Sequence, residues 1–218
     1  MYVFTSWSGG KDSCLALYRA LKAGFKVNYL LSMLDEDGVK SKGHGLDKSL
    51  LNAQAKALGI PIIYGKASWE TYEEEFKRII KSLKNKGIQG GIFGDIKLQE
   101  HKEWVEKVCG EVGIKAFEPL WNEKYETLLG EFFGKGFEAL IINVKTSLIG
   151  DEWVGQPFNH KFIEYLKNRE VDLFGENGEY HTLVTYSPIF KQRIKILETK
   201  KNLRNDRVTL KILRFKLV

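Results

Sequence analysis

From the N-terminus to about residue 116, short apolar runs alternate with stretches whose apolar residues recur at helical spacing. This alternation predicts strands and helices in turn. The strands are expected at residues 2–7, 27–34, 61–64, 90–94 and 114–117. The helices are expected at residues 12–23, 46–58 and 70–84 and around Leu98, Trp104, Val105, Val108 and Cys109. Gly59, which is followed by Pro61, should end the second helix.

Five strands that alternate with helices indicate an α/β fold with a doubly wound parallel sheet. Ligands of such sheets bind outside the carboxyl ends of the strands, near the point where the strand order reverses. The turn after the first strand should therefore lie at the binding edge of the sheet.

The pattern changes after Glu118-Pro119, which predicts a boundary between a domain at 1–118 and a domain at 119–218. The second domain is expected to be a smaller α+β domain, with helices at 125–133 and 161–169 and an apolar run at 139–144. Its last strands are expected at 180–186, 193–198 and 208–218. The apolar positions of the last strand change phase between Ile212 and Leu213, which predicts a β-bulge there.

The positive charge of the chain is concentrated at its C-terminal end. Residues 187–218 contain ten Lys or Arg and two Asp or Glu, a charge of +8 against +6 for the whole chain. Such a segment could meet nucleic acid or an acidic protein. The alternative, which we favour, is a sheet whose outer face carries lysines that protect its edge.

Several classes of protein are excluded by what the sequence lacks. No run approaches the roughly 18 apolar residues of a membrane span, and MYVFTSWSGG lacks the features of a signal peptide. We therefore expect a cytoplasmic protein that does not associate with membranes. Cys14 and Cys109 lie inside apolar helical patterns and should be buried free thiols. No CxxC pair is present to bind zinc or carry sulfur.

The segment Ser8-Gly9-Gly10-Lys11-Asp12-Ser13 follows a predicted strand and opens a predicted helix. Its two glycines allow a sharp turn and a close approach of the backbone to a ligand. The helix N-terminus, the serine hydroxyls and the lysine cation together suit a pyrophosphate. Asp12 is placed either to bind Mg²⁺ or to cap the helix. The segment matches neither the Walker A pattern nor the dinucleotide-binding GxGxxG pattern.

This segment resembles the SGGxDS motif of the PP-loop ATP pyrophosphatases. The resemblance implies a PP-loop, Rossmann-like domain that binds ATP and Mg²⁺ and holds the β and γ phosphates as a leaving pyrophosphate. The α-phosphate then stays open to a nucleophile. Catalysis is expected to come from positioning and charge stabilisation.

Two further strand ends are expected to face the nucleotide. Adenine should lie over the end of the second strand, where Met33 and Leu34 offer backbone polar groups. Gly94-Asp95 should face the same cleft, with Asp95 positioning a metal or nucleophile or, alternatively, capping the next helix. His44 either lies over the nucleotide or caps the helix that follows it.

A second polar cluster, Gly175-Glu176-Asn177-Gly178-Glu179-Tyr180-His181-Thr182, lies between apolar segments. Asn177-Gly178 alone suits a hairpin turn, which leaves two carboxylates and an imidazole unexplained. In a strand that starts at Gly178, Glu179 and His181 point to one face and Tyr180 to the other. A binding site and a polar-faced hairpin both fit this pattern.

The segment GENGEYHTLV resembles the C-terminal motif of the diphthine–ammonia ligase (diphthamide synthetase) family. Other segments similar to that family are, in order, SGGKDS, His44-Gly45, QAKALGIP, Gly94-Asp95-Ile96, VEKVC, Pro119-Leu120-Trp121 and GFEA. The similarity runs from Ser8 to about Phe190. Residues 94–98 depart from a longer polar stretch of the family, and the basic end resembles no motif that we recognise.

The resemblance implies an amide-forming ligase. The carboxylate of diphthine, a modified histidine on elongation factor 2, attacks the α-phosphate of ATP, and ammonium nitrogen then displaces AMP. Residues 8–13 are implied to bind ATP, with Lys11 and Asp12 catalytic and Asp12 on Mg²⁺. The residues expected on the substrate side are Glu176, Asn177, Gly178, Glu179, Tyr180 and His181. Of these, Glu176, Glu179 and His181 are also expected to be catalytic, and the face of Tyr180 suits the trimethylammonium group of diphthine.

Two other functions fit parts of the sequence. A PP-loop enzyme that adenylates tRNA bases suits the basic end, but no zinc cluster, cysteine pair or known RNA-binding module accompanies it. A non-catalytic ATP sensor would need neither Lys11 nor the cluster at 176–181. His101, near an apolar helix face, is expected to be structural. We expect free or partner-delivered ammonium and no nucleic acid as partners, and the sequence leaves open whether the chain forms a homo-oligomer.

Overall fold

The computed structural model describes residues 1–218, which divide into two compact units. The first unit comprises Met1–Ser8 and Asp12–Asn122, and the second comprises Gly9–Lys11 and Glu123–Val218. The main division therefore follows Asn122, whereas the sequence predicted a boundary near residue 118. Three residues of the Gly-rich turn cluster with the second unit, which nothing in the sequence indicated.

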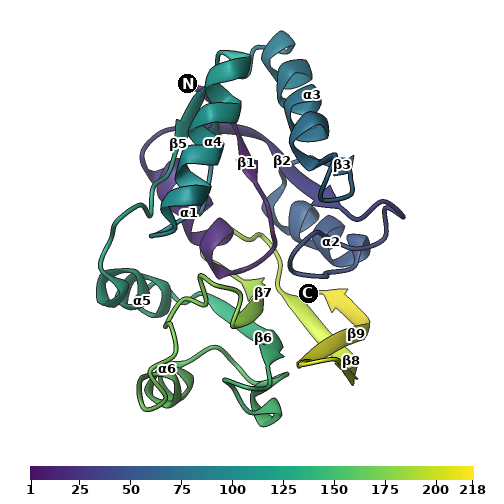
Figure 1. The fold of residues 1–218 in the computed structure, drawn as a ribbon, viewed down its shortest axis with the longest axis vertical. Coiled ribbons are helices and arrows are strands. Elements are labelled where there is room, and N and C mark those ends of the chain that lie inside the picture. The colour runs from purple at the N-terminus through teal and green to yellow at the C-terminus, as the bar shows by residue number, and fades with distance from the viewer. The chain divides into compact units, whose positions relative to one another are not determined.

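The first unit contains a five-stranded parallel sheet in the order β3-β2-β1-β4-β5 (Figure 1). Its strands are β1 (Tyr2–Ser6), β2 (Lys26–Leu34), β3 (Ile62–Lys66), β4 (Gly90–Ile92) and β5 (Lys115–Phe117). The helices between them are α1 (Lys11–Lys22), α2 (Lys48–Leu58), α3 (Tyr72–Asn85) and α4 (Gln99–Val112). The predicted α/β fold with a doubly wound parallel sheet is confirmed.

The strand order reverses at β1. The chain passes from β1 outward through β2 and β3, then crosses back to β4 and β5 on the other side. Right-handed crossovers place α1 and α2 on one face of the sheet and α3 and α4 on the other. The carboxyl ends of β1 and β4 are neighbours at this switch point, where sheets of this kind bind ligands.

Apolar residues at helical spacing explain how the helices pack. In α3 the buried residues are Phe76, Ile79, Ile80 and Leu83, and they join Phe4 and Val108 in one core cluster. Burying each such side chain contributes about 2 kcal/mol. Gly59 ends α2 in the left-handed conformation (φ 70°), and both cysteines are free and buried, as expected. The longest helices have 14 residues, and no helix has the length and apolar character needed to cross a membrane.

The second unit contains a four-stranded antiparallel sheet in the order β7-β6-β9-β8. Its strands are β6 (Glu138–Lys145), β7 (Tyr180–Tyr186), β8 (Ile194–Arg204) and β9 (Arg207–Leu217). Its helices are α5 (Tyr125–Gly134), α6 (His160–Lys167) and a short 3₁₀ helix at Asp151–Trp153. The smaller α+β domain expected after the parallel sheet is therefore present.

The C-terminal hairpin carries the predicted bulge. Arg214 pairs with Glu198 and Ile212 pairs with Thr199, so Leu213 has no partner across the hairpin. Strand β8 is longer than predicted and lies at the edge of the sheet. Its exposed lysines, Lys195, Lys200 and Lys201, suit the edge-protecting interpretation of the basic end.

Candidate active site

The Gly-rich turn joins β1 to α1 at the carboxyl edge of the parallel sheet. Gly9 has a φ of 81°, in the left-handed region that glycine adopts at little cost. The hydroxyls of Ser8 and Ser13 lie 3.0 Å apart across the turn. Asp12 is in the first turn of α1, so the positive end of the helix dipole opens at this point.

Gly94, just beyond the end of β4, packs against this turn. A Cβ atom on Gly94 would lie 2.9 Å from the carbonyl carbon of Asp12 and 3.0 Å from the backbone nitrogen of Ser13. Both are backbone atoms that cannot move aside as a flexible side chain can. Gly94 therefore allows two of the expected ATP-binding segments to lie against each other.

Lys11 belongs to the second unit and is enclosed within it. Its side chain is 3% exposed, and its ammonium group donates a hydrogen bond to the carbonyl oxygen of Phe174. The ring centroids of Tyr180 and Phe174 lie 4.8 Å and 5.3 Å from the ammonium nitrogen. The ammonium group is thus enclosed by a carbonyl and aromatic faces, and its contact with phosphate stays a prediction.

The Gly-rich turn and the strand that carries the second motif are in direct contact. The backbone N–H of Lys11 donates to the Thr182 hydroxyl at 3.0 Å, although the two residues are 171 positions apart. The N–H of Val184 donates to the carbonyl oxygen of Gly9 at 3.0 Å. The structure thus brings residues of both predicted sites together at Gly9–Lys11 and β7.

The residues of the turn fit a magnesium-bound nucleotide. The close backbone packing at Gly94 leaves no space for a side chain, and the Ser13 hydroxyl and the α1 N-terminus are polar groups suited to phosphate. No group of three or more His, Cys, Asp or Glu residues is arranged to hold a metal ion. Mg²⁺ is commonly bound by one or two carboxylates together with substrate phosphates and waters. Asp12 is the carboxylate that the turn offers.

The end of β2 is already hydrogen-bonded within the chain. The carbonyl oxygens of Met33 and Leu34 accept from the N–H groups of Lys42 (2.9 Å) and Ala67 (3.2 Å). The contact of these residues with adenine stays a prediction. His44 lies in the turn before α2, but the N-cap of α2 is Asp47, so His44 does not cap this helix.

Asp95 and His101 lie together beyond the end of β4. Oδ1 of Asp95 is 3.2 Å from Nδ1 of His101. Helix α4 starts after Leu98, so the alternative in which Asp95 caps it is wrong. The side chain of His101 is 59% exposed and lines a pocket, so it is not packed into the core, and the expectation that it is structural stays a prediction. The apolar periodicity of α4 did not show that this part of the helix faces the open edge of the sheet.

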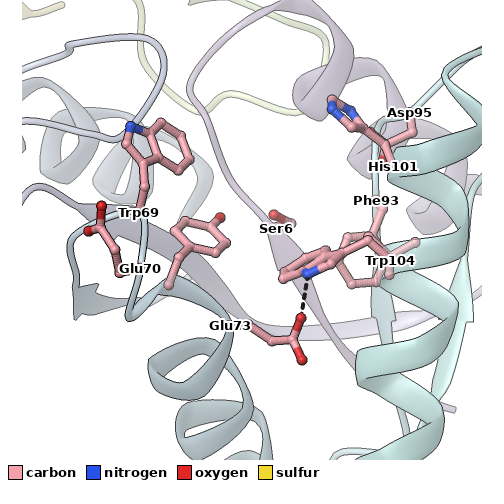
Figure 2. A pocket seen from close by; sticks show the side chains of 10 residues that line it. Ser6, Trp69, Glu70, Glu73, Phe93, Asp95, His101 and Trp104 are labelled. Atoms are coloured by element: carbon pink, nitrogen blue, oxygen red, sulfur yellow. Dashed lines mark hydrogen bonds and ion pairs between the residues drawn. The ribbon is translucent and has the colours of Figure 1, made fainter.

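A pocket of about 640 Å³ opens at the carboxyl ends of β1 and β4 (Figure 2). We call it the aromatic pocket. Its lining residues are Ser6, Trp69, Glu70, Tyr72, Glu73, Phe93, Asp95, His101, Trp104 and Val105. The sequence did not identify its aromatic residues as part of a site, although Trp69 and Tyr72 follow a predicted strand end, which is a signal that could have found them.

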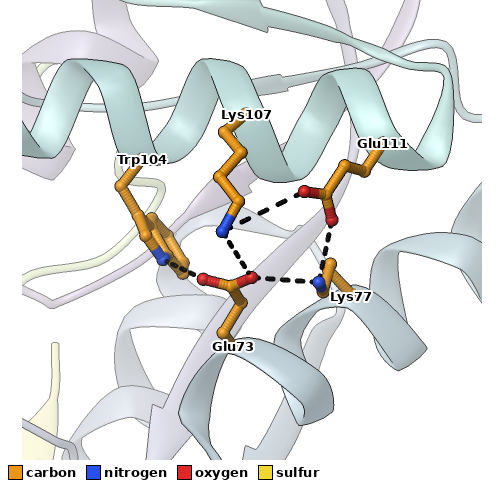
Figure 3. Close-up of polar contacts among 5 residues, drawn as sticks. All are labelled: Glu73, Lys77, Trp104, Lys107 and Glu111. Carbon is orange, nitrogen blue, oxygen red and sulfur yellow. Dashed lines mark hydrogen bonds and ion pairs between the residues drawn. The ribbon is translucent and has the colours of Figure 1, made fainter.

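Glu73 fixes the position of one wall of the aromatic pocket. Its carboxylate accepts the indole N–H of Trp104 at 3.0 Å and ammonium N–H groups of Lys77 (2.9 Å) and Lys107 (3.0 Å) (Figure 3). Both lysines also pair with Glu111. The hydrogen bonds from Lys77 and Lys107 lower the pKa of Glu73 to about 2, so this carboxyl is ionised at neutral pH. The network ties α3 to α4 and orients the Trp104 ring.

The second motif begins as a tight turn that leads into β7. The N–H of Gly178 donates to the carbonyl oxygen of Gly175 at 2.9 Å, and both glycines have positive φ. The buried carboxylate of Glu179 accepts the backbone N–H of Asn177 at 3.0 Å and its side-chain amide at 3.4 Å. No strand precedes the turn, so the hairpin alternative is wrong. Glu179 stabilises this turn, and the substrate contacts of Glu176, Asn177, Gly178 and Glu179 stay predictions.

Tyr180 belongs to the core of the second unit. It is 1% exposed, and its hydroxyl donates to the carbonyl oxygen of Leu173 at 2.7 Å. Its ring contacts Phe162 and lies beside the Lys11 ammonium. The ring therefore has no accessible face for diphthine, contrary to the expectation from the sequence. Strand alternation places Tyr180 opposite Glu179 and His181, and the side that Tyr180 faces is the aromatic core around Phe162.

His181 and Arg207 lie close to each other beside the motif turn. Burial, together with the charges of Arg207 and Lys11, lowers the pKa of His181 to about 4, so the imidazole is neutral at pH 7. The Arg207 guanidinium donates to Asn143 Oδ1 (2.9 Å) and to the carbonyl oxygen of Gly178 (2.7 Å). The sequence did not indicate a role for Arg207, because nothing local distinguishes it from the other basic residues of the C-terminal end.

Family models match the chain over almost its whole length. Residues 1–116 match the diphthamide synthase N-terminal domain, and residues 124–218 match the diphthamide synthase C-terminal domain. The chain belongs to the diphthamide synthase family. The family resemblance inferred from residues 8–13 and 175–184 is thereby confirmed.

Relatives of this family member are named diphthine–ammonia ligase. That of Schizosaccharomyces pombe is 27% identical over 88% of this chain, which spans only 35% of the yeast protein. Those of Bos taurus and Homo sapiens are 26% identical over 86% of this chain and 79% of their own length. This chain also superposes on a crystal structure described as a predicted subunit of tRNA methyltransferase from Methanocaldococcus jannaschii, with a TM-score of 0.46 and 19% sequence identity. The superposition covers 84% of this chain and 96% of the other. A likeness of that degree says nothing about function.

Proposed function

We propose that this member of the diphthamide synthase family is a diphthine–ammonia ligase, which uses ATP and ammonium to convert diphthine on elongation factor 2 to diphthamide. The observation that supports this most strongly is the match to both family domains, together with the name shared by the relatives. The contact of Gly9 and Lys11 with β7 also supports it, because one reaction would use residues from both motifs.

The proposed reaction has two steps. A carboxylate oxygen of diphthine attacks the α-phosphorus of ATP, and the bond to the oxygen that bridges the α and β phosphates breaks, which releases pyrophosphate. Ammonia nitrogen then attacks the acyl carbon, AMP leaves and a proton is released. Residues 8–13 would hold the leaving pyrophosphate at the N-terminus of α1, where fixed dipoles stabilise developing negative charge. Asp12 would bind the Mg²⁺ that accompanies the nucleotide.

The second motif would receive the acceptor and the ammonium. Its carboxylates, Glu176 and Glu179, suit cationic groups. His181 is neutral at pH 7, because its pKa is lowered to about 4, and a neutral imidazole can accept a hydrogen bond from ammonium. Asp95, beside His101, remains a candidate for positioning the attacking carboxylate. We also propose that the protein is cytoplasmic. Whether it forms a homo-oligomer is left to measurement.

The deciding experiment examines elongation factor 2 from a strain that lacks this protein. Mass spectrometry should find diphthine in place of diphthamide, and the purified protein with ATP and ammonium should restore diphthamide and release AMP. Release of ADP and orthophosphate would contradict the proposal. Pyrophosphate release with tRNA but not with elongation factor 2 would indicate a tRNA-modifying enzyme. ATP that stays intact with every acceptor would indicate a sensor.

A further inference from the structure

Three aromatic side chains form a continuous surface along the aromatic pocket. The ring centroids of Trp69 and Tyr72 are 5.8 Å apart, and those of Tyr72 and Trp104 are 5.7 Å apart. Trp69 is 67% exposed, although tryptophan is usually well buried. Large aromatic surface kept open at a pocket of this size indicates contact with a ligand.

The charged groups that line the aromatic pocket are acidic. They are Glu70, Glu73 and Asp95, and no Lys or Arg is among the lining residues. Lys77 and Lys107, which do not line the pocket, pair with Glu73 and offset its charge. Glu70 and Asp95 therefore contribute most of the negative electrostatic potential in the pocket. A hydrogen bond from Ser68 lowers the pKa of Glu70, so this carboxyl is ionised at neutral pH.

A cation already lies on one of the aromatic rings. The ammonium nitrogen of Lys42 is 4.9 Å from the centroid of the Trp69 ring. Lys42 comes from the loop between β2 and α2 and also pairs with Asp35 at 3.2 Å. The Trp69 ring is therefore placed where it attracts positive charge within the chain itself.

We propose that the aromatic pocket binds the trimethylammonium group of diphthine, an inference that rests on the proposed ligase function. A quaternary ammonium has no N–H to donate, so aromatic faces and nearby carboxylates recognise it in place of hydrogen bonds. A polyphosphate would meet the carboxylates of Glu70 and Asp95 in a pocket whose lining residues include no lysine or arginine, although the ammonium of Lys42 lies above the Trp69 ring. The cation site thus lies at residues 69–104, and not at the buried ring of Tyr180.

The position of the pocket suits the proposed reaction. Ser6 lines the pocket and precedes Ser8 by two residues, which limits their Cα atoms to a separation of about 8 Å. Diphthine carries its carboxylate and its trimethylammonium group on the same side chain. Holding the ammonium in the pocket would therefore keep the carboxylate near the Gly-rich turn.

Choline and its neutral isostere 3,3-dimethyl-1-butanol test this inference without any turnover. In ¹H–¹⁵N NMR titrations, choline should shift the indole signals of Trp69 and Trp104 and leave that of Trp153, in the second unit, unchanged. The neutral alcohol should produce no comparable shifts. Trp69→Leu should weaken choline binding at least about tenfold, the loss expected for a strong cation–π contact.

Tyr2→Leu is the matched control, because Tyr2 is also an exposed aromatic residue under a lysine but lies at the opposite end of β1. This variant should bind choline like the unchanged protein. Equal shifts with choline and with the alcohol would overturn the proposal, as would displacement of choline from Trp69 by ATP.

The ligase assay separates this inference from the proposed function. Trp69→Leu should raise the KM for diphthine-bearing elongation factor 2 about tenfold and leave the KM for ATP unchanged. If the unchanged protein and Trp69→Leu turn over the elongation factor equally well, the ligase stands and the pocket assignment fails. If choline binds as described but diphthine is never amidated, the pocket is a quaternary ammonium site and the ligase proposal fails.

Discussion

The charged side chains of the two motifs differ in how far the chain encloses them. Lys11 is buried against a carbonyl and aromatic rings, where a hydrogen bond and cation–π attraction offset the cost of removing an ammonium from water. Glu179 is buried, and its carboxylate accepts hydrogen bonds from the backbone and side-chain N–H groups of Asn177. Asp12 is only half-buried, at a helix start that favours negative charge. Of these three residues, Asp12 is the one best placed to meet Mg²⁺.

Asp12→Ala should lower the rate of AMP formation by at least about 100-fold, because Mg²⁺ would lose its protein carboxylate. Asp12→Asn keeps the side-chain shape and should show a similar loss. The free energy of unfolding of both variants should lie within about 1 kcal/mol of that of the unchanged protein, because Asp12 is only half-buried and helix-dipole contributions are of this size. Rates of AMP release and urea unfolding curves check this, and near-normal turnover would reject the role of Asp12.

His181 should make the stability of the protein depend on pH between about 4 and 6.5. The unfolded chain binds a proton as pH falls through 6.5, whereas the folded imidazole resists protonation down to about 4. The free energy of unfolding should therefore fall as pH falls across this window and level off below it. Between pH 7 and pH 5 we expect a loss of about 1–2 kcal/mol from this residue.

The measurement is urea unfolding at both pH values for the unchanged protein and for His181→Gln. The variant should lose less stability on acidification, because glutamine does not titrate. Parallel losses in the two proteins would show that His181 is not held neutral by the fold.

At the scale of elements, the Gly-rich turn is shaped by two strands that its own sequence does not contain. The end of β4 packs its backbone against the start of α1 at Gly94. Strand β7 binds the backbone of Gly9 and Lys11 through Val184 and Thr182. The conformation of the turn is thus determined by β4 and β7 as well as by its glycines.

Gly94→Ala should distort the Gly-rich turn, because the new methyl group would lie about 3 Å from backbone atoms of Asp12 and Ser13. We expect a loss of about 1–3 kcal/mol in stability and weaker ATP binding by calorimetry. Gly110→Ala, in α4, is the matched control, since its Cβ would meet nothing within 4 Å. That change should stabilise the helix by up to about 1 kcal/mol and leave ATP binding unchanged. Equal ATP affinities in both variants would contradict the role of Gly94.

At the scale of the whole molecule, the basic C-terminal end is an integral part of the second unit. Strand β9 lies inside the sheet between β6 and β8, and Val208 and Ile212 are buried. Arg207, at the start of β9, binds the carbonyl oxygen of Gly178 in the second motif. The net charge of this segment is carried largely on exposed positions of β8 and β9, as the protected-edge interpretation predicts.

Deleting residues 191–218 should abolish cooperative unfolding of the second unit, because β6 would lose its partner β9 and the motif turn would lose Arg207. Circular dichroism and urea unfolding measure this. As a control, Lys195→Glu with Lys200→Glu changes the charge of the exposed edge strand without touching the core. The free energy of unfolding of this control should differ from that of the unchanged protein by no more than about 0.5 kcal/mol per substituted site. A deletion variant that unfolds like the full chain would show that the segment is accessory.

The sequence by itself determined the elements and the family. Local periodicity was enough to predict all five strands of the parallel sheet, the strand at Tyr180–Tyr186, the end of α2 at Gly59 and the bulge at Leu213. These features depend on residues that are neighbours along the chain, so the pattern of side chains predicts them directly. The matched motifs at 8–13 and 175–184 likewise indicated the family.

Only the tertiary structure decided how side chains from distant segments meet. Periodicity marked an apolar stripe on α4 but did not show that His101 and Trp104 line a pocket with Trp69 and Tyr72. It placed Tyr180 opposite His181 without showing that Tyr180 packs into the aromatic core of the second unit. The hydrogen bond from Lys11 to Phe174 and that from Arg207 to Gly178 each join residues more than 25 positions apart. Local sequence does not encode which elements pack together, so it could not predict these contacts.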